Sequence, residues 1–331
     1  YVSQNNIYLT FPDYTWQEDE TMKTAIQRIK IDKQAITFAA QGEVPGYVLN
    51  QFSMDEHNGY FRIATTTGHI ARTFTEATSE NNVYVLDMNL NVVGKLEDLA
   101  PGEKIYSARF MGDRCYLVTF RKIDPLFVID LTEPTAPKIL GSLKVTGYSG
   151  YLHPYDENHL IGIGKETEAA EKDDFAWYQG VKISLFDVSD VSNPVELAKY
   201  EIGDRRSDSP VLWDHKALLF DRARNLLVLP IMLAEIDPSQ YDGEVPPDAY
   251  GEYVWQGAYV FDISLDGLEL RGRITHMEDN ADLLKLGYYF TSSYSVERSL
   301  YIDNVLYTIS GMKAKMNSLE TLAEINEVEL S

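Results

Sequence analysis

The chain consists of short runs in which apolar and polar residues alternate, and these runs occur in pairs. Residues 126–145 read LFVIDLTEPTAPKILGSLKV, and residues 183–202 read ISLFDVSDVSNPVELAKYEI. Each stretch contains an alternating run that ends in Asp, a turn rich in Pro, Ser, Thr or Asn, and a second alternating run. Alternation with a period of two predicts β-strands, and the short polar turn between two such runs predicts a hairpin.

The run that ends in Asp occurs five times, at Asp32, Asp87, Asp130, Asp187 and Asp262. An Asp carboxylate can accept a hydrogen bond from a backbone N–H two residues further on and so stabilise a turn. We therefore interpret these five residues as turn caps and not as catalytic candidates.

A second kind of hairpin precedes each of the Asp-ending hairpins. It consists of an apolar run, a polar turn and a β-branched or aromatic run, as in ARFMGDRCYLVTF, and a clipped version, YVSQNNIYLTF, opens the chain. Together the two hairpins form a unit of four antiparallel strands. Six such units can be recognised, and they begin near residues 1, 47, 105, 148, 214 and 296.

Repeated four-strand units with almost no helix between them predict an all-β protein, a β-propeller of four-stranded antiparallel blades. A two-sheet sandwich is the alternative, but its sequence would not repeat the same four-strand pattern. We predict a single β-propeller domain over residues 1–331. Its six blade units either close a ring by themselves or belong to a larger ring.

The composition excludes several classes of protein. Asp and Glu outnumber Lys and Arg by 51 to 29, a formal net charge of −22 that argues against binding to nucleic acid. The single cysteine, Cys115, excludes an internal disulfide framework. The longest apolar stretch, residues 226–233, is far too short for a transmembrane segment.

The long connections of the predicted blades share one face. They join the second strand of a blade to its third strand, or the fourth strand to the next blade, and both kinds of connection emerge on the same side. Long loops on a rigid scaffold commonly carry binding residues. All four tryptophans fall in these loops or at their edges, and His215 lies at the entry to an inner strand. The candidate ligand-binding residues are Trp16, Trp177, Trp213, Trp255, Tyr178, Tyr253 and His215. The alternative is that these aromatic residues only pack the loops together.

The connection over residues 231–257 contains six acidic residues and no Lys or Arg. Carboxylate and carbonyl oxygens favour calcium over a transition metal, although the spacing matches no EF-hand loop. The candidate ligands of a calcium ion are Asp237, Asp242, Glu244 and Asp248.

Catalytic motifs are absent from the sequence: it contains no GxSxG, no HExxH, no phosphate-binding loop and no dinucleotide fingerprint. A glycosidase needs only two suitably placed carboxylates, and the many acidic residues keep that alternative open.

Several stretches resemble one known family, among them GEVPGYVLNQFSMDEHNGYFRIATTTG, YLHPYDENHLIGIG, KISLFDVSDVSNPVELAKY, WDHKALLFD and RSLYIDNVLYTIS. It is the group described as secreted proteins containing a C-terminal β-propeller domain, distantly related to WD-type repeats and found in bacteria and archaea. The resemblance extends over residues 1–331. It implies a propeller and a secreted or cell-surface location, and it implies no established reaction. It also implies further propeller sequence ahead of the matching region in members of the family.

These observations favour an extracytoplasmic binding or assembly module that is not an enzyme and that uses the acidic, aromatic long-loop face. Its expected partner is a protein or a glycan at the cell surface. One alternative is a propeller hydrolase that acts on extracellular glycans with paired loop carboxylates. The other is a surface protein whose loops are ordered by calcium.

Overall fold

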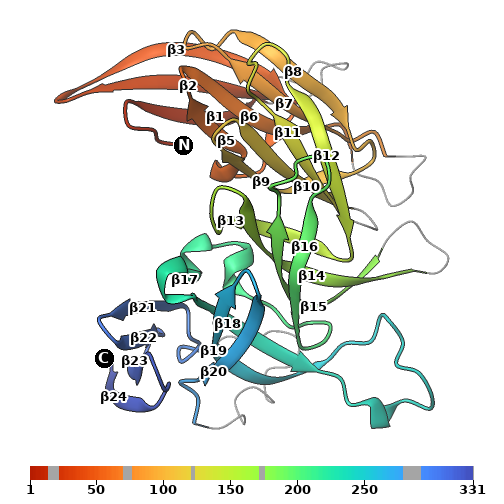
Figure 1. Ribbon diagram of the computed structural model, residues 1–331, viewed down its shortest axis with the longest axis vertical. Helices are drawn as coiled ribbons and strands as arrows, with labels where there is room; N and C mark the ends of the chain where they lie inside the picture. Colours follow the sequence, from red (N-terminus) through yellow and green to blue (C-terminus); the bar gives the residue numbers. More distant parts are fainter. Residues whose placement is uncertain (14–21, 70–76, 121–123, 171–175, 279–291, 331) are drawn as a thin grey trace. The chain divides into compact units, whose positions relative to one another are not determined.

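The computed structural model describes residues 1–13, 22–69, 77–120, 124–170, 176–278 and 292–330, and within them nearly all regular structure is β-strand (Figure 1). The strands form six antiparallel sheets of three to five strands that follow one another along the chain. This arrangement confirms the predicted all-β propeller fold.

The first three sheets are formed by residues 6–145. The first contains, in this order, β1 (Asn6–Asp13), β2 (Lys23–Asp32) and β3 (Ala35–Pro45). The second contains β4 (Tyr47–Val48), β6 (Tyr60–Thr67), β7 (Glu80–Leu86) and β8 (Val92–Leu99), and β5 (Met54–His57) also pairs with β6. The third contains β9 (Lys104–Met111), β10 (Arg114–Phe120), β11 (Asp124–Asp130) and β12 (Lys138–Val145).

The last three sheets are formed by residues 148–329. The fourth contains β13 (Tyr148–Pro154), β14 (His159–Ala169), β15 (Ala176–Asp187) and β16 (Val195–Ile202). The fifth contains β17 (Leu219–Asp221), β18 (Leu226–Glu235), β19 (Glu252–Ser264) and β20 (Gly267–Ile274). The sixth contains β21 (Arg298–Ile302), β22 (Val305–Ile309), β23 (Lys313–Ser318) and β24 (Glu324–Glu329).

Short 3-10 turns lie between some of these strands. They are η1 (Gln51–Ser53), η3 (Pro210–Leu212), η4 (His215–Ala217), η5 (Arg222–Arg224) and η6 (Pro238–Gln240). The clipped hairpin at the start of the chain is present as an isolated bridge between Val2 and Ile7 beside β1. The first sheet therefore has three strands where the other units have four or five.

The predicted turn caps are confirmed at three of the five positions. Asp87, Asp130 and Asp187 each accept a hydrogen bond from the backbone N–H two residues further on, at 2.8, 2.9 and 2.8 Å. At Asp187, bonds from the hydroxyl and the backbone N–H of Ser189 hold the pKa of the carboxyl below its ordinary value.

The cap prediction is wrong at the other two positions. Asp32 ends β2 and pairs with Ala35 across a two-residue turn in which Lys33 has a φ of 48°, and its carboxylate accepts no hydrogen bond among the described residues. Asp262 lies inside β19, which continues to Ser264, and its carboxylate lies 3.5 Å from Nε of Arg271.

The chain divides into two compact units, and the boundary passes through the fourth sheet. The first unit comprises residues 1–159, 169–176 and 187–195, and the second comprises residues 160–168, 177–186 and 196–331.

In the first unit, neighbouring sheets pack face to face. The Tyr8 ring of the first sheet stacks on the Phe61 ring of the second, with ring centroids 4.1 Å apart, and Ile26 and Val44 join the same cluster. The other face of the second sheet packs on the third through residues such as Val83. A middle strand such as β6 is therefore buried on both faces, and its residues form a continuous buried run.

The first sheet has a second, uncovered face. The register places Ile7 opposite Ile29, and Ile29 opposite Phe38, so these side chains share one face of the sheet. Phe38 is 62% exposed, and Ile36 on the same strand is 71% exposed. This blade therefore presents apolar side chains on the face opposite its core.

Candidate ligand-binding site

A cavity of about 430 Å³ lies in the second unit, within the size range of small-molecule sites. Three segments line it: residues 208–214, the facing parts of β18 and β19, and residues 292–298. These are the connections on the face that the sequence predicts to carry binding residues. The lining residues are Asp208, Pro210, Trp213, Asp214, Met232, Tyr253, Gln256, Ser292, Ser295, Val296, Glu297 and Arg298.

Backbone hydrogen bonds fix the first wall of the cavity to the sheet. Asp208, in the connection between β16 and β17, and Met232 of β18 exchange two backbone bonds of 2.8 Å each. The hydroxyl of Ser209 donates to the carbonyl of Pro230 at 2.7 Å. The segment over residues 208–214 is thereby attached along the edge of β18.

Gln256 fixes the second wall. Its amide nitrogen donates to the carbonyl of Val296 at 3.0 Å, and its amide oxygen accepts from the N–H of Val296 at 2.9 Å. Gln256 and Val296 are both buried. Because a buried pair of bonds in low dielectric is costly to break, residues 292–298 are held against β19.

Two ion pairs join the charged lining residues. Arg298 Nη2 bonds Oδ2 of Asp214, while Oδ1 of Asp214 accepts from the N–H of Lys216 at 3.1 Å. This N–H and the Arg298 guanidinium hold the pKa of the Asp214 carboxyl below its ordinary value. Asp208 Oδ1 lies 2.9 Å from Nζ of the buried Lys165. Burial lowers the pKa of Lys165, and the Asp208 charge opposes that shift.

A β-bulge decides which aromatic side chain reaches the cavity. Trp255 pairs with Leu233, but Tyr253 pairs with Ala234, so the register shifts by one residue between them. Paired residues point to the same face of a sheet, and successive residues point to opposite faces. Tyr253 therefore points to the cavity face and Trp255 points away from it.

Trp213 is the exposed aromatic group of the cavity. It follows η3, and its side chain is 69% exposed. Its backbone N–H donates to the carbonyl of Pro210 at 3.1 Å, which fixes the direction in which the side chain leaves the chain. An indole this exposed on a hydrogen-bonded turn offers a flat apolar surface to a ligand.

The ring of Trp177 is in contact with the side chain of Arg205, which is not among the predicted binding residues. The Arg205 guanidinium lies 4.8 Å from the Trp177 ring centroid and 4.3 Å from that of Tyr250, and its Nη2 donates to the Tyr250 hydroxyl at 2.9 Å. The Arg205 carbonyl also accepts from the N–H of Gly251 at 2.9 Å. Arg205 therefore attaches the connection before β19 to the start of β15.

Arg205→Met is expected to lower the free energy of unfolding by about 1–2 kcal/mol, since two cation–π contacts and one hydrogen bond are lost. It should also speed proteolysis within residues 237–251. Arg205→Lys should restore only part of the stability, because an ammonium cannot stack between two rings. Urea unfolding and limited proteolysis measure both effects. Equal stability of all three proteins would contradict this role.

Three further predicted residues that the structure describes do not line the cavity. The Arg273 guanidinium lies 5.1 Å from the ring centroid of Trp255, and the Trp255 ring packs edge-on against Tyr259. Tyr178 is 41% exposed on β15. His215 lies half-buried in η4 and is not among the described lining residues. Trp16 lies outside the described residues.

The four predicted calcium ligands are not gathered into one site. Asp237 uses its carboxylate to cap η6, where it accepts from the N–H of Ser239 at 2.9 Å and from its hydroxyl at 2.6 Å. Asp242, Glu244 and Asp248 are exposed. Across the described part of the chain, no group of three or more His, Cys, Asp or Glu side chains could hold a metal ion.

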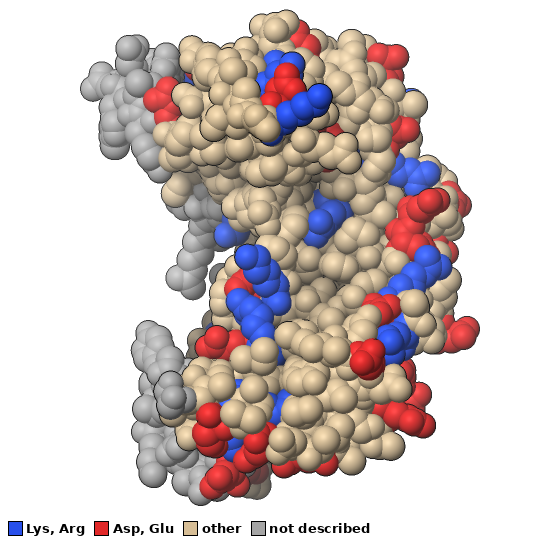
Figure 2. Space-filling model, turned by 90° about the vertical axis from the view of Figure 1, so that its left-hand side faces the viewer, with Lys and Arg blue, Asp and Glu red and all other residues tan. Residues whose placement is uncertain are grey.

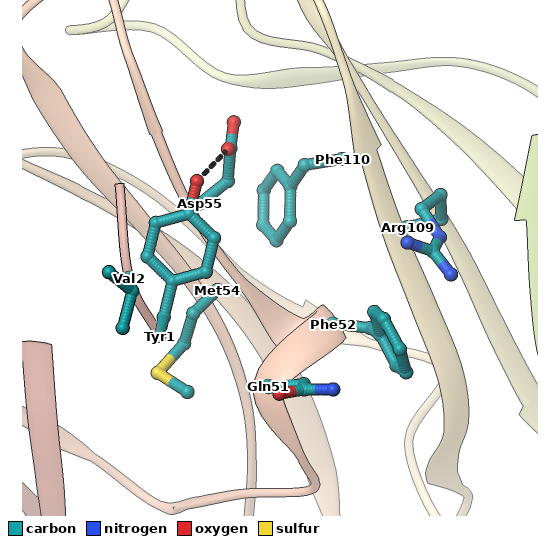
Figure 3. A pocket seen from close by; sticks show the side chains of 8 residues that line it. All are labelled: Tyr1, Val2, Gln51, Phe52, Met54, Asp55, Arg109 and Phe110. Atoms are coloured by element: carbon teal, nitrogen blue, oxygen red, sulfur yellow. Dashed lines mark hydrogen bonds between the residues drawn. The ribbon is translucent and has the colours of Figure 1, made fainter. Parts of the chain in front are cut away.

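A second cavity, of about 420 Å³, lies in the first unit between η1, β5 and β9 (Figure 3). Its polar groups have partners: Tyr1 donates to Asp55 at 3.0 Å, and Arg109 donates to the carbonyl of Leu152 at 2.6 and 2.9 Å. The Arg109 guanidinium also lies 4.1 Å from the Phe52 ring centroid. This cavity contains none of the predicted binding residues.

On the face drawn in Figure 2, acidic and basic side chains lie next to one another in several places, and large areas carry neither. The charge on this face is not concentrated in one patch. Exposed pairs such as Lys23–Glu43, at 2.7 Å, contribute to this mixing. Among the described residues, no helix has the length and apolar character needed to cross a membrane.

Successive antiparallel sheets of about four strands each are the blades of a β-propeller. The family model of the Beta propeller domain matches residues 1–322. The chain therefore belongs to the beta propeller domain family.

Two archaeal relatives are similar over nearly the whole chain. An uncharacterized protein of Methanocaldococcus jannaschii is 38% identical over 305 residues, which cover 92% of this chain and 40% of that protein. An uncharacterized protein of Archaeoglobus fulgidus is 35% identical over 321 residues, which cover 96% of this chain and 42% of that protein. The chain thus spans less than half the length of the curated relatives that it matches.

Solved structures are similar at low sequence identity. Apo AztD from Citrobacter koseri is 13% identical, with a TM-score of 0.43 over 94% of this chain and 83% of that chain. The C-terminal WD40 domain of Sif2 is 8% identical, with a TM-score of 0.41 over 94% of this chain and 69% of that chain.

Proposed function

We propose that this chain is an extracytoplasmic binding module that is not an enzyme and that takes its ligand in the cavity beside Trp213 and Tyr253. The observation that carries the proposal is the 69% exposed indole of Trp213 at a cavity whose walls are fixed by hydrogen bonds. Preformed walls lower the entropic cost of binding, and an exposed aromatic ring supplies contact area. The location outside the cytoplasm is supported by the sequence resemblance.

The alternative of a glycan hydrolase has less support. A general acid needs a carboxyl whose pKa is raised, whereas the pKa of Asp214 is lowered by the Lys216 N–H and by Arg298. The calcium-ordered alternative has no gathered set of ligands in the described residues. No observation favours either alternative over the binding proposal.

Trp213→Ala is expected to weaken ligand binding at least about 30-fold, the loss typical of a central aromatic contact of about 2 kcal/mol. Tyr178→Ala, which removes an exposed aromatic ring on β15 outside the cavity, is the matched control and should bind normally. Calorimetric titration with a panel of neutral oligosaccharides, a lysine-rich peptide and polygalacturonate measures the affinities. Thermal melting checks that both variants are folded.

The proposal is wrong if no member of the panel binds. It is also wrong if a member binds with equal affinity to the wild-type protein and to Trp213→Ala, or if Tyr178→Ala loses as much affinity as Trp213→Ala. Turnover of a neutral oligosaccharide would instead support the hydrolase alternative.

A further inference from the structure

We infer that the cavity binds the ring of a neutral sugar, as part of a glycan, and not a charged peptide. This inference rests on the proposed function and specifies the class of its ligand. It follows from two properties of the lining residues: most of their charges are already paired within the protein, and an exposed aromatic ring stands beside polar groups.

The charged side chains have partners before any ligand arrives. Asp214 bonds Arg298, and Asp208 bonds the buried Lys165, which also donates to the carbonyl of Ser207. A cationic or anionic ligand would therefore have to compete with partners that these charges already have, which reduces the gain from each new ion pair. Glu297 is the one lining carboxylate without an ion pair among the described residues, and a single exposed carboxylate gives a basic peptide little affinity.

The cavity also presents apolar surface. The Trp213 indole is 69% exposed, and the side chains of Pro210, Met232 and Val296 contribute to the lining. A ligand must cover this surface to gain from the hydrophobic effect. A pyranose ring has a face of C–H groups that can stack on an aromatic ring and cover this surface.

Polar groups surround this apolar surface and suit hydroxyl groups. The Asp214–Arg298 pair places an acceptor and a donor side by side, which matches two adjacent hydroxyls of a sugar. Ser292 and Ser295 also line the cavity.

Acidic polymers fit the site least. The formal net charge of the chain is −22, and the lining contains Asp208, Asp214 and Glu297. Approach of a polyanion would be opposed by this field at low salt. The arrangement therefore favours a neutral glycan over both kinds of charged ligand.

The panel above, titrated at about 50 and 500 mM salt, tests this inference. A neutral oligosaccharide should bind saturably, and its affinity should change less than about twofold with salt, because no net charge is neutralised. Arg298→Met should weaken that binding about 10-fold, since a charge-assisted hydrogen bond is lost. Trp213→Phe, which keeps an aromatic face, should retain more affinity than Trp213→Ala.

Different results would overturn the inference and the proposed function separately. If the lysine-rich peptide or polygalacturonate binds in a Trp213-dependent manner, weakens at 500 mM salt, and no neutral oligosaccharide binds, the ligand class is wrong and the binding function stands. If a neutral oligosaccharide binds but its affinity is unchanged in Arg298→Met, Trp213→Phe and Trp213→Ala, the site itself is wrong.

Discussion

Phe61→Ala is expected to destabilise the first unit by about 3–5 kcal/mol, the usual cost of removing a buried phenyl ring. Phe61 is 0% exposed on β6, and its ring stacks on Tyr8 between the first and second sheets. Removal of the ring leaves a cavity between the first and second sheets, in the cluster where the two blades pack against each other. Urea unfolding followed by far-UV circular dichroism measures the change.

Phe38→Ala is the matched control for this prediction. It removes the same ring from β3, where the side chain is 62% exposed on the uncovered face of the first sheet. We expect a change within about 0.5 kcal/mol, as for other exposed positions. A cost at Phe38 as large as that at Phe61 would show that this face is covered in solution and would contradict its description as an uncovered face.

Acidification from pH 6.5 to about 4 is expected to destabilise the second unit through His276. The ring is 2% exposed, and its two nitrogens lie 3.0 Å from the Ser310 hydroxyl and 2.8 Å from the Thr308 hydroxyl. Burial, aided by the positive charges of Lys315 and Lys313, lowers the pKa of His276 to about 4.

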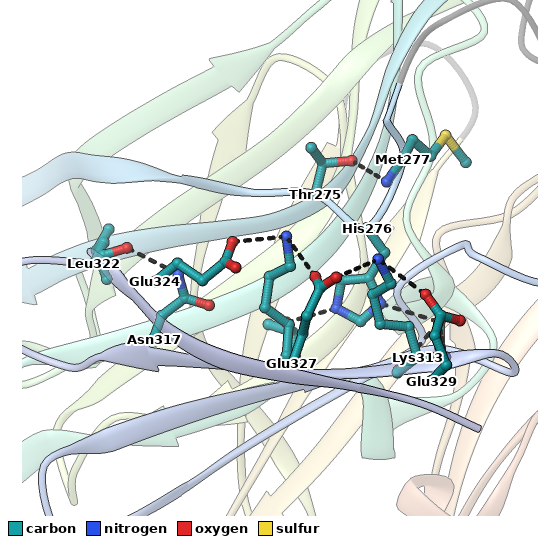
Figure 4. A network of polar contacts seen from close by, with 12 residues as sticks. Thr275, His276, Met277, Lys313, Asn317, Leu322, Glu324, Glu327 and Glu329 are labelled. Carbon is teal, nitrogen blue, oxygen red and sulfur yellow. Dashed lines mark hydrogen bonds and ion pairs between the residues drawn. The ribbon is translucent and has the colours of Figure 1, made fainter.

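The surrounding groups belong to the last sheet (Figure 4). Lys313 pairs with Glu327 at 3.0 Å and with Glu329 at 3.2 Å, and Lys315 pairs with Glu324 at 3.0 Å. Glu327 opposes the lowering of the His276 pKa but does not cancel it. The two lysines and the buried position therefore keep the imidazole neutral in the folded protein.

The sign of the pH effect follows from linkage. Below pH 6.5 the unfolded chain binds a proton at His276, while the folded protein does not until about pH 4. The stability that the neutral ring provides is complete above pH 6.5 and is lost as the pH falls toward 4. We expect this loss to be about 2–3 kcal/mol.

His276→Gln is the control variant, because an amide can bond both hydroxyls and does not titrate. The variant should be less stable at pH 7.5 but should lose less stability than the wild-type protein between pH 6.5 and 4. Urea unfolding at a series of pH values measures both slopes. Identical slopes would contradict the proposed role of His276. Turn-capping carboxylates such as Asp187, with lowered pKa values, lose their contribution only below this window.

The fold could be predicted from the sequence because every blade of a propeller repeats the same pattern of strands and turns. Each hairpin needs its own turn, and turn-forming residues such as Asp130 and Asp187 mark the ends of strands in the sequence. Alternation survives on outer strands such as β16, where one face is exposed. It disappears in β6, which is buried on both faces, and there only the apolar run itself signals a strand.

The candidate site could be predicted only in part. Trp213 and Tyr253 were identified because aromatic residues in long connections are visible in the sequence. The separation of Tyr253 from Trp255 depends on a bulge in β19, and a bulge of one residue leaves no mark in an aromatic-rich segment. The sequence does not reveal the roles of Arg205 and Gln256, because these depend on partners about 28–45 residues away in the sequence, Trp177, Tyr250 and Val296.

The calcium prediction shows why acidic composition alone is weak evidence for a metal site. Asp237 satisfies its carboxylate with the backbone and hydroxyl of Ser239 in its own turn. Calcium requires several carboxylates that point to one position, and a carboxylate that caps its own turn is not free to do so. Sequence spacing could not distinguish these two uses of the same residue.

The most direct test of the binding account is a nuclear magnetic resonance titration of the protein labelled with ¹⁵N at its four tryptophan indoles, with each signal assigned by single substitution. Neutral oligosaccharides from the panel are the ligand. The account predicts that the Trp213 signal shifts saturably while the signals of Trp177 and Trp255, which lie against Arg205 and Arg273, stay in place. A saturable shift of Trp16, Trp177 or Trp255 with no change at Trp213, or no shift of any signal, would contradict it.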